Sequence, residues 1–183
     1  PAYQPLLDSL SRAAPSLNKE ALRHAVAAMQ CAVNNGAQPA QRLAVIDYSL
    51  PSTARRLWIF DLKRQRVLLR DFVAHGRQSG ENLATRFSNS EGSHQSSLGL
   101  FRTAESYQGK HGYSLRLDGL SPGKNCNARK RAIVVHGAAY ASPTHLRKYD
   151  KLGRSWGCPA LPREQSRAII DIIKGGSVIY AHG

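Results

Sequence analysis

The sequence is poor in cysteine and in long apolar runs, and both shortages exclude classes of protein. Only three of its 183 residues are cysteines, Cys31, Cys126 and Cys158, and no two of them form a Cys-x-x-Cys pair. Zinc sites built on paired cysteines are therefore disfavoured. No apolar run approaches the roughly 20 residues that a membrane-spanning helix needs, so we expect no stable membrane insertion. The first residues show no basic segment followed by an apolar one, and we expect any targeting segment to have been removed.

Acidic residues are also scarce. The chain has 12 Asp and Glu residues against 26 Lys and Arg residues, which gives a formal net charge of +14. A surface this basic attracts polyanions, so nucleic acid, anionic lipid surfaces and anionic cell-wall polymers are candidate partners. The tightest basic cluster, residues 129–131, is too short for a nucleic-acid-binding tail, and no RNA- or DNA-reading motif is recognisable. Nucleic acid is therefore the least favoured of the three partners.

The remaining composition is typical of a globular protein. Hydrophobic residues make up 42% of the chain and charged residues 21%, and the length allows one sizeable core. We expect one main domain over residues 41–183, preceded by a helical extension over residues 1–40.

Hydrophobic periodicity predicts helices near both ends of the chain and strands between them. Apolar residues recur at helical spacing over residues 18–36, and residues 6–10 and 162–174 are also predicted to be helical. Strands are predicted over residues 43–48, 57–62, 67–74, 97–103, 113–117, 132–136 and 177–181. Strands in series predict a mostly β structure with some helix, antiparallel rather than built from βαβ repeats. Three loops are longer than a connection needs: residues 76–95, 118–131 and 137–157.

One pair of residues combines the features of a nucleophile and its base. His136 ends an apolar run, which would fix the imidazole at the rim of a sheet. Cys158 follows Gly157 in a sharp turn and precedes a proline and a helix, a setting in which backbone N–H groups approach a substrate and the thiol pKa falls. Lys151 and Arg154 are expected to lower that thiol pKa further. The pair predicts nucleophilic catalysis by Cys158, with His136 as its base or ion-pair partner.

The surrounding motifs resemble the L,D-transpeptidase (YkuD-like) family, in particular the branch of murein L,D-transpeptidase catalytic domains. The stretches that carry the resemblance are Val73-Ala74-His75-Gly76, Phe87-Ser88-Asn89, Ser96-Ser97-Leu98-Gly99, Gly109-Lys110-His111-Gly112-Tyr113-Ser114-Leu115, His136-Gly137 and Gly153-Arg154-Ser155-Trp156-Gly157-Cys158-Pro159-Ala160-Leu161. They extend over most of the chain, about residues 43–180. The fold implied is a β-sandwich or barrel-like catalytic domain. The order histidine before cysteine disfavours papain-like, transglutaminase-like and NlpC-type hydrolases.

The resemblance implies a peptidoglycan L,D-transpeptidase that acts outside the cytoplasm, in the periplasm or otherwise exported. Cys158 would attack the peptide bond between an L-centre and a D-residue of a stem peptide, and His136 would transfer the proton. The N–H groups of Gly157 and Cys158 would stabilise the oxyanion. The acyl group would then pass from the thioester to an amine or to water. No metal and no organic cofactor is implied, and carbapenem-type β-lactams are expected to acylate Cys158.

Substrate binding is expected from six further residues, Arg154, Ser155, Trp156, Tyr140, His111 and Tyr113. Trp156 stands where most of the superfamily has histidine, which alters the immediate surroundings of the nucleophile. Ala160 stands where a polar residue or arginine is usual in the family and commonly contacts the substrate. We therefore expect Arg154 to supply this substrate contact. Two alternatives stay open: an L,D-carboxypeptidase only, and a non-catalytic basic module that binds the cell wall.

The two other cysteines are candidates for a disulfide. Cys31 lies opposite the apolar face of the helix predicted over residues 18–36, and Cys126 lies in a polar loop. Two thiols off the core of an exported protein predict a Cys31–Cys126 bridge.

Overall fold

The computed structural model describes all 183 residues, and its centre is one eight-stranded β-sheet. The strands are β1 (Arg42–Asp47), β2 (Leu57–Asp61), β3 (Arg66–Asp71), β4 (Gly99–Gly109), β5 (Gly112–Gly119), β6 (Val134–Ala138), β7 (Ala160–Pro162) and β8 (Val178–His182). They lie side by side in the order β3-β2-β1-β8-β4-β5-β6-β7. Five of the seven strand pairs are antiparallel, and only β1–β8 and β6–β7 are parallel. The predicted mostly antiparallel β structure is confirmed.

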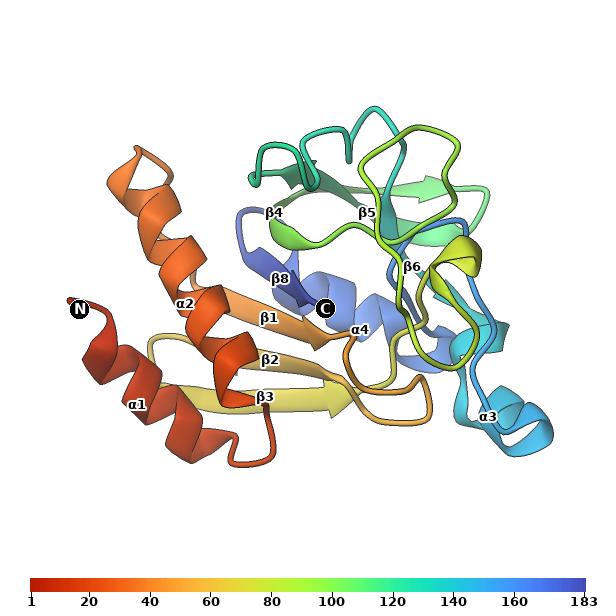
Figure 1. Ribbon diagram of the computed structural model, residues 1–183, viewed down its shortest axis with the longest axis horizontal. Coiled ribbons are helices and arrows are strands. Elements are labelled where there is room, and N and C mark those ends of the chain that lie inside the picture. The colour runs from red at the N-terminus through yellow and green to blue at the C-terminus, as the bar shows by residue number, and fades with distance from the viewer.

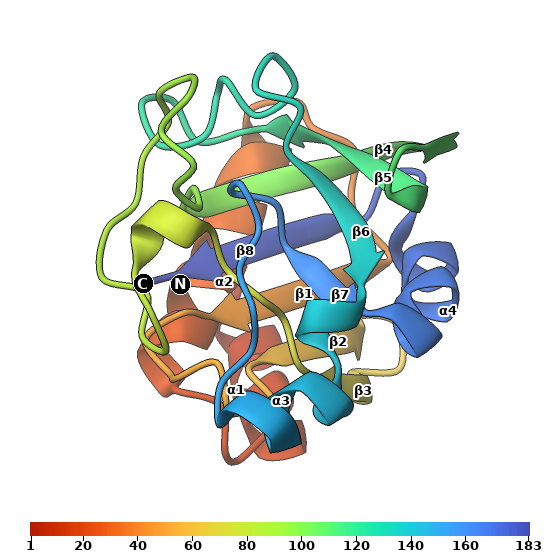
Figure 2. The same ribbon diagram turned by 90° about the vertical axis from the view of Figure 1, so that its right-hand side faces the viewer.

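The sheet curls until its two edges nearly meet. Beyond the end of β3, the N–H of Ala74 donates to the carbonyl of Ala160 in β7 at 2.8 Å, and the two residues form an antiparallel bridge. Because β3 and β7 are the outermost strands, this bridge makes the sheet a nearly closed barrel (Figure 1 and Figure 2). The expected barrel-like catalytic fold is thus confirmed, with all strands in one continuous sheet.

Four α-helices accompany the barrel: α1 (Gln4–Ala13), α2 (Lys19–Asn34), α3 (Pro143–Tyr149) and α4 (Arg163–Ile173). The helix α2 starts where it does because the side chain of Asn18 accepts the N–H groups of Glu20 and Ala21, at 2.8 and 3.0 Å. The three predicted helices correspond to α1, α2 and α4. The helix α3, of only seven residues, lies inside the predicted loop 137–157, and so short a helix leaves little periodicity to detect.

The strand β1 separates two hydrophobic cores. Leu43 and Val45 face outward and pack with the apolar sides of α1 and α2, whereas Ala44 and Ile46 face the barrel interior. This alternation follows from the two-residue period of a strand. Both faces are apolar because both are covered: α1 and α2 lie along one side of β1, β2 and β3 (Figure 1), and the buried isoleucines of α4 join the interior core.

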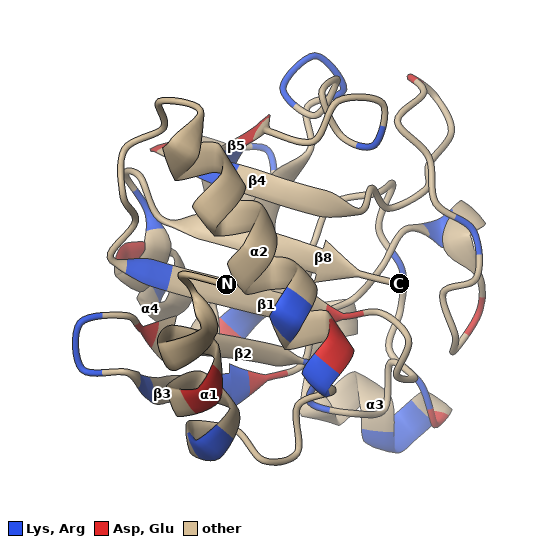
Figure 3. Ribbon diagram, turned by 60° about the vertical axis from the view of Figure 1, so that its left-hand side comes forward, with Lys and Arg blue, Asp and Glu red and all other residues tan.

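The charged residues of α2 are confined to its first turns. They are Lys19, Glu20 and Arg23, and the rest of the helix carries no Lys, Arg, Asp or Glu (Figure 3).

No helix has the length and apolarity needed to cross a membrane. Both N-terminal helices contact the sheet, and the division of the chain at residue 40 stays a prediction.

All three cysteines are free, so the predicted Cys31–Cys126 disulfide is wrong. The thiol of Cys31 lies near the end of α2, where it accepts a hydrogen bond from Asn35 at 3.5 Å. Cys126 instead accepts one from Asn89 at 3.2 Å, across the loops 76–95 and 118–131. Each sulfur therefore has a different asparagine as its neighbour. The exposure of a residue on a helix or in a loop does not indicate which other residue lies beside it.

Candidate active site

The position of His136 is set by pairing on both sides of β6. His136 is opposite Ser114 of β5 and opposite Ala160 of β7, and it is only 2% exposed. The preceding residues Val134 and Val135 are also buried. The imidazole is thus fixed in the sheet, but the predicted place at the rim is wrong, because β6 continues to Ala138 and is paired on both sides of His136.

Cys158 is held by a turn that Ser155 organises. The hydroxyl of Ser155 donates to the carbonyl of Cys158 at 2.6 Å and accepts the N–H of Gly157 at 3.1 Å. Gly157 has φ +117°, and a Cβ there would lie 2.7 Å from the carbonyl oxygen of Gln95, so only glycine fits this turn. The turn brings the Cys158 sulfur to the start of β6, 3.4 Å from the N–H of Val134.

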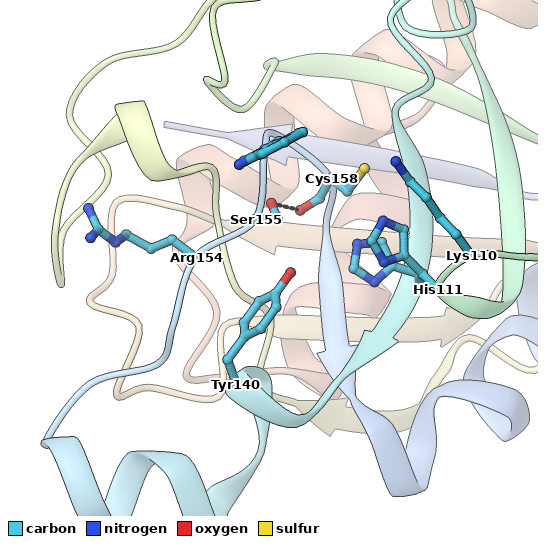
Figure 4. A pocket seen from close by; sticks show the side chains of 8 residues that line it. Lys110, His111, Tyr140, Arg154, Ser155 and Cys158 are labelled. Atoms are coloured by element: carbon cyan, nitrogen blue, oxygen red, sulfur yellow. Dashed lines mark hydrogen bonds between the residues drawn. The ribbon is translucent and has the colours of Figure 1, made fainter.

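Cys158 and His136 open onto one pocket of about 330 Å³ (Figure 4). Its lining consists of Lys110, His111, His136, Tyr140, Arg154, Ser155, Trp156 and Cys158. Seven of the nine predicted site residues are therefore brought together here. Gly157 lies within the turn that holds Cys158, and Tyr113 is elsewhere. Lys110 was not predicted, although the glycines on either side of Lys110 and His111 mark a tight turn that projects both side chains.

Tyr113 lies on the other face of β5 from the pocket. Its hydroxyl donates to Asp171 of α4 at 2.6 Å, and the Arg167 guanidinium lies 4.2 Å from its ring centroid. Ser114 is opposite His136, and successive strand residues point to opposite faces, so Tyr113 points toward α4. The structure thus does not bring Tyr113 to the predicted site, because the period of the strand turns it away.

The hydrogen bonding of His136 indicates which ring nitrogen is free. Its Nδ1 lies 2.9 Å from the carbonyl oxygen of Gly137, which can only accept, so Nδ1 carries the proton. In the neutral ring Nε2 is then free to accept a proton. Burial lowers the pKa of His136, the Gly137 carbonyl raises it, and the neighbouring His111 lowers it again, for a net decrease. The imidazole is therefore neutral at neutral pH, as a general base must be.

A second imidazole covers the first. His111, in the turn between β4 and β5, stacks on His136 with ring centroids 4.4 Å apart and an interplanar angle of 15°. In the turn that holds Cys158, Trp156 stacks on His94 with ring centroids 4.7 Å apart and an interplanar angle of 6°. Trp156 is 65% exposed, so it forms an accessible aromatic wall of the pocket.

The Cys158 thiol is less acidic than the sequence indicated. Burial raises its pKa, while the N–H of Val134, then Arg131 and Lys110, lower it, for a net increase. The expectation that Lys151 and Arg154 lower this pKa is wrong. Both cations pair instead with Glu81, at 2.7 and 3.1 Å. A protonated thiol at neutral pH needs a base for its activation, and His136 brings a neutral imidazole to the same pocket.

Tyr140 offers a hydroxyl to the pocket. Figure 4 shows this hydroxyl directed toward Ser155 and Cys158, and it makes no hydrogen bond within the protein. Burial raises the pKa of Tyr140 to about 12, and the Cys158 charge adds to this increase, so the hydroxyl stays protonated. It is therefore a hydrogen-bond donor at every pH at which the protein is expected to work.

His75 does not line the pocket, but its backbone is hydrogen-bonded to the turn that holds Cys158. It is fully buried, its Nδ1 accepts from Arg56 at 2.8 Å, and its Nε2 donates to the carbonyl of Glu81 at 2.9 Å. Its own carbonyl accepts the N–H of Ser155 at 3.0 Å. No three His, Cys, Asp or Glu side chains gather closely enough to hold a metal ion.

Three solved structures of L,D-transpeptidases are similar to this chain. An L,D-transpeptidase from Mycobacterium smegmatis is 15% identical with a TM-score of 0.47, and the match covers 79% of this chain and 59% of that chain. LD transpeptidase LdtMt1, solved in complex with imipenem, is 14% identical with a TM-score of 0.46, over 77% of this chain and 58% of that chain. L,D-transpeptidase 1 of Mycobacterium tuberculosis is 13% identical with a TM-score of 0.44, over 78% and 62% of the two chains.

Family membership rests on the sequence rather than on these distant structures. The chain spans less than two thirds of the length of each of the three. A search of curated proteins gave no match. The family described as "L,D-transpeptidase catalytic domain" matches residues 13–182, nearly the whole chain. The chain therefore belongs to the L,D-transpeptidase catalytic domain family.

Proposed function

We propose that this domain is a peptidoglycan L,D-transpeptidase that works through a thioester on Cys158. The observation that carries the proposal is the shared pocket of Cys158 and His136, which is lined by both a half-buried thiol and a neutral imidazole with a free Nε2. A nucleophile and a base in one pocket are the minimum that acyl transfer requires. Peptidoglycan lies outside the cytoplasm, so we place the domain there.

The first half of the reaction forms the thioester. His136 Nε2 takes the proton of the Cys158 thiol, and the sulfur attacks the carbonyl carbon of the L-centre. The carbonyl electrons move onto oxygen, which gives a tetrahedral oxyanion. When the oxyanion collapses, the C–N bond breaks, and protonated His136 returns its proton to the departing nitrogen of the D-residue.

The second half regenerates the enzyme. An amine of another stem peptide, or water, loses a proton to His136 and attacks the thioester carbon. The C–S bond then breaks and the thiolate recovers the proton from His136. Attack by an amine gives a cross-link, and attack by water gives a shortened stem peptide.

Two donors are suited to the oxyanion. The N–H of Cys158 makes no hydrogen bond within the protein, and the Tyr140 hydroxyl is free and directed toward the pocket centre (Figure 4). The N–H of Gly157, expected to share this role, is already bonded to Ser155 Oγ at 3.1 Å. We therefore assign the oxyanion to Cys158 N–H and Tyr140, with Gly157 shaping the turn.

The proposed mechanism also predicts covalent inhibition by β-lactams. One similar structure holds imipenem, and another is an avibactam carbamoyl enzyme. A strained cyclic amide presents the carbonyl that Cys158 attacks but keeps its leaving group tethered. We propose that carbapenems acylate Cys158, with Trp156 limiting the room available to their substituents.

The experiment is incubation of Cys158→Ala with purified muropeptides, read by mass spectrometry. Release of the terminal D-residue from a stem tetrapeptide should fall by about 10³-fold or more. His136→Ala should lower it by about 10²–10⁴-fold. Cys126→Ala, which removes a thiol outside the pocket, is the matched control and should keep the wild-type rate.

The product masses distinguish the alternatives. A cross-linked dimer indicates transpeptidation, and a stem shortened by one residue indicates carboxypeptidase activity alone. Turnover that persists unchanged in Cys158→Ala, with the fold intact, would overturn the thioester mechanism. Wild-type protein that binds muropeptides without converting them would favour the non-catalytic wall-binding module.

A further inference from the structure

Two cationic side chains, Arg154 and Lys110, line the pocket, and only one of them is paired with an acidic residue. Arg154 pairs with Glu81 at 3.1 Å and donates to the carbonyl of Arg77, also at 3.1 Å. Figure 4 shows its guanidinium directed away from Cys158. Lys110 takes part in no ion pair and no hydrogen bond, and its ammonium group lies toward Cys158 in the same view. Of the two pocket cations, only Lys110 has its charge free for a ligand.

The place of Lys110 is determined by the turn that carries it. Gly109 pairs with Gly112 at the end of the β4–β5 hairpin, and Lys110 and His111 form the two-residue tip between them. His111 stacks on His136, so this tip is anchored beside the proposed base. The ammonium group of Lys110 lies toward Cys158 in the pocket (Figure 4), and its positive charge opposes the effect of burial on the pKa of that thiol.

The proposed reaction supplies an anion at a matching place. The departing group is a D-residue, and when that residue ends the stem its α-carboxylate is separated from the scissile nitrogen by a single carbon. A carboxylate so close to the reacting bond must lie in the same pocket as the nucleophile. A cation with no partner of its own is the group that binds such a carboxylate most readily.

We propose that Lys110 binds the α-carboxylate of the departing D-residue and so selects stem peptides that end at that residue. This inference rests on the proposed function. It gives to Lys110 a substrate contact of the kind expected from Arg154, whose charge is instead paired with Glu81. A longer stem carries an amide in place of the carboxylate and gains nothing from the ammonium. Lys110 is thereby a specificity-determining residue, whereas nucleophilic attack and proton transfer remain assigned to Cys158 and His136.

The test compares two stem tetrapeptides that differ only at the end, one with a free carboxylate and one with a carboxamide. The third residue of both is lysine, which carries no side-chain carboxylate. Lys110→Met keeps the length of the side chain and removes the charge. It should lower kcat/KM by about 10-fold for the free acid, chiefly through KM, and by less than about 2-fold for the amide. Lys110→Arg should stay within about 3-fold of wild type on both.

A matched control lies at another hairpin tip. Lys63, in the exposed turn between β2 and β3, lies outside the pocket, and Lys63→Met should leave both rates unchanged. An equal loss on acid and amide in Lys110→Met would overturn the assignment while leaving the proposed function intact. So would wild-type protein with no preference for the acid. Wild-type protein that releases the D-residue from neither peptide nor from natural muropeptides would refute the proposed function itself.

Discussion

Burial makes the thiol of Cys158 and the imidazole of His136 neutral together. It raises the pKa of the first and lowers that of the second, so neither group is charged at neutral pH. An ion pair formed in advance, one of the two arrangements expected from the sequence, is therefore disfavoured. We expect His136 to act instead as a general base when a substrate is in place.

This protonation state predicts an order of thiol reactivity. Hydrogen bonds from Gly123 and Asn89 lower the pKa of Cys126, whereas burial raises that of Cys158. At pH 7, iodoacetamide should therefore alkylate Cys126 faster than Cys158, because only the thiolate reacts. Single-thiol variants, each with the other two cysteines replaced by serine, allow mass spectrometry to follow each site. Faster alkylation of Cys158 would contradict the neutral pair and indicate a thiolate stabilised by His136.

His75 predicts a loss of stability in acid. Burial, and then the Arg56 charge, lowers its pKa to about 4 from the ordinary 6.5. The unfolded chain therefore binds this proton more readily, and the stability that depends on neutral His75 is lost as pH falls from about 6.5 toward 4. The size of the effect is about 3 kcal/mol, at 1.36 kcal/mol for each pKa unit.

Urea unfolding at pH 7 and pH 4.5 measures this loss. His75→Asn should reduce the difference in unfolding free energy between the two pH values. His24→Asn, on the exposed side of α2 with its side chain 43% exposed, serves as the comparison and should retain the difference. An unchanged difference in His75→Asn would place the acid sensitivity elsewhere.

At the scale of elements, the β4–β5 hairpin covers the proposed base. His111 stacks on His136 and both shields it and lowers its pKa by charge. We expect His111→Ala to lower kcat by about 3- to 10-fold, the range that aromatic stacking energies allow. His111→Phe should restore most of the rate, because the stack is kept.

The pH profile separates this positioning role from a general loss of structure. Both variants lack the His111 charge, so the pKa of His136 should rise and the acid limb of kcat/KM should move to higher pH. The shift should be larger in His111→Ala, which also exposes His136 to water. A lower rate with an unmoved acid limb would mean that the hairpin acts on something other than His136.

At the scale of the whole molecule, α1 and α2 are the outer cover of the barrel. With the sheet they bury Leu43, Trp58, Phe60 and Leu100, each no more than 2% exposed. Exposing these side chains costs about 1.5–3 kcal/mol each, a total comparable to the stability of a typical domain. Removing the helices should therefore leave a barrel that does not stay folded.

Truncation tests this directly. A protein lacking residues 1–36 should be insoluble or lose its cooperative thermal transition. One lacking only residues 1–13 removes α1, which buries just Leu7 and Leu10, and should fold with a lowered Tm. A truncation at residue 37 that keeps the wild-type Tm would support a separate extension ending near residue 40.

Local patterns in the sequence were enough for most of the fold and for the centre of the site. Apolar periodicity indicated α2 and α4, and β-branched runs indicated most of the strands, because side-chain repeat and backbone geometry are linked over a few residues. Cys158 and His136 were predicted from their motifs and the turn that Gly157 permits, and the structure brings both to one pocket. The strand β7 escaped notice because three residues carry no period.

Contacts between residues far apart in the chain decided the features of the site that the sequence did not predict. Glu81 neutralises Arg154 across 73 positions, the alternation along β5 turns Tyr113 toward α4, and the β4–β5 turn delivers Lys110 to the pocket. The protonation of Cys158 and His136 depends on burial by residues far away in the chain. The sequence by itself determined which groups are proposed for the chemistry, since that depends on residue type and local turn. Charge pairing, solvent exposure and the face on which a side chain lies depend on long-range packing, so only the tertiary structure decided which neighbours act on those groups.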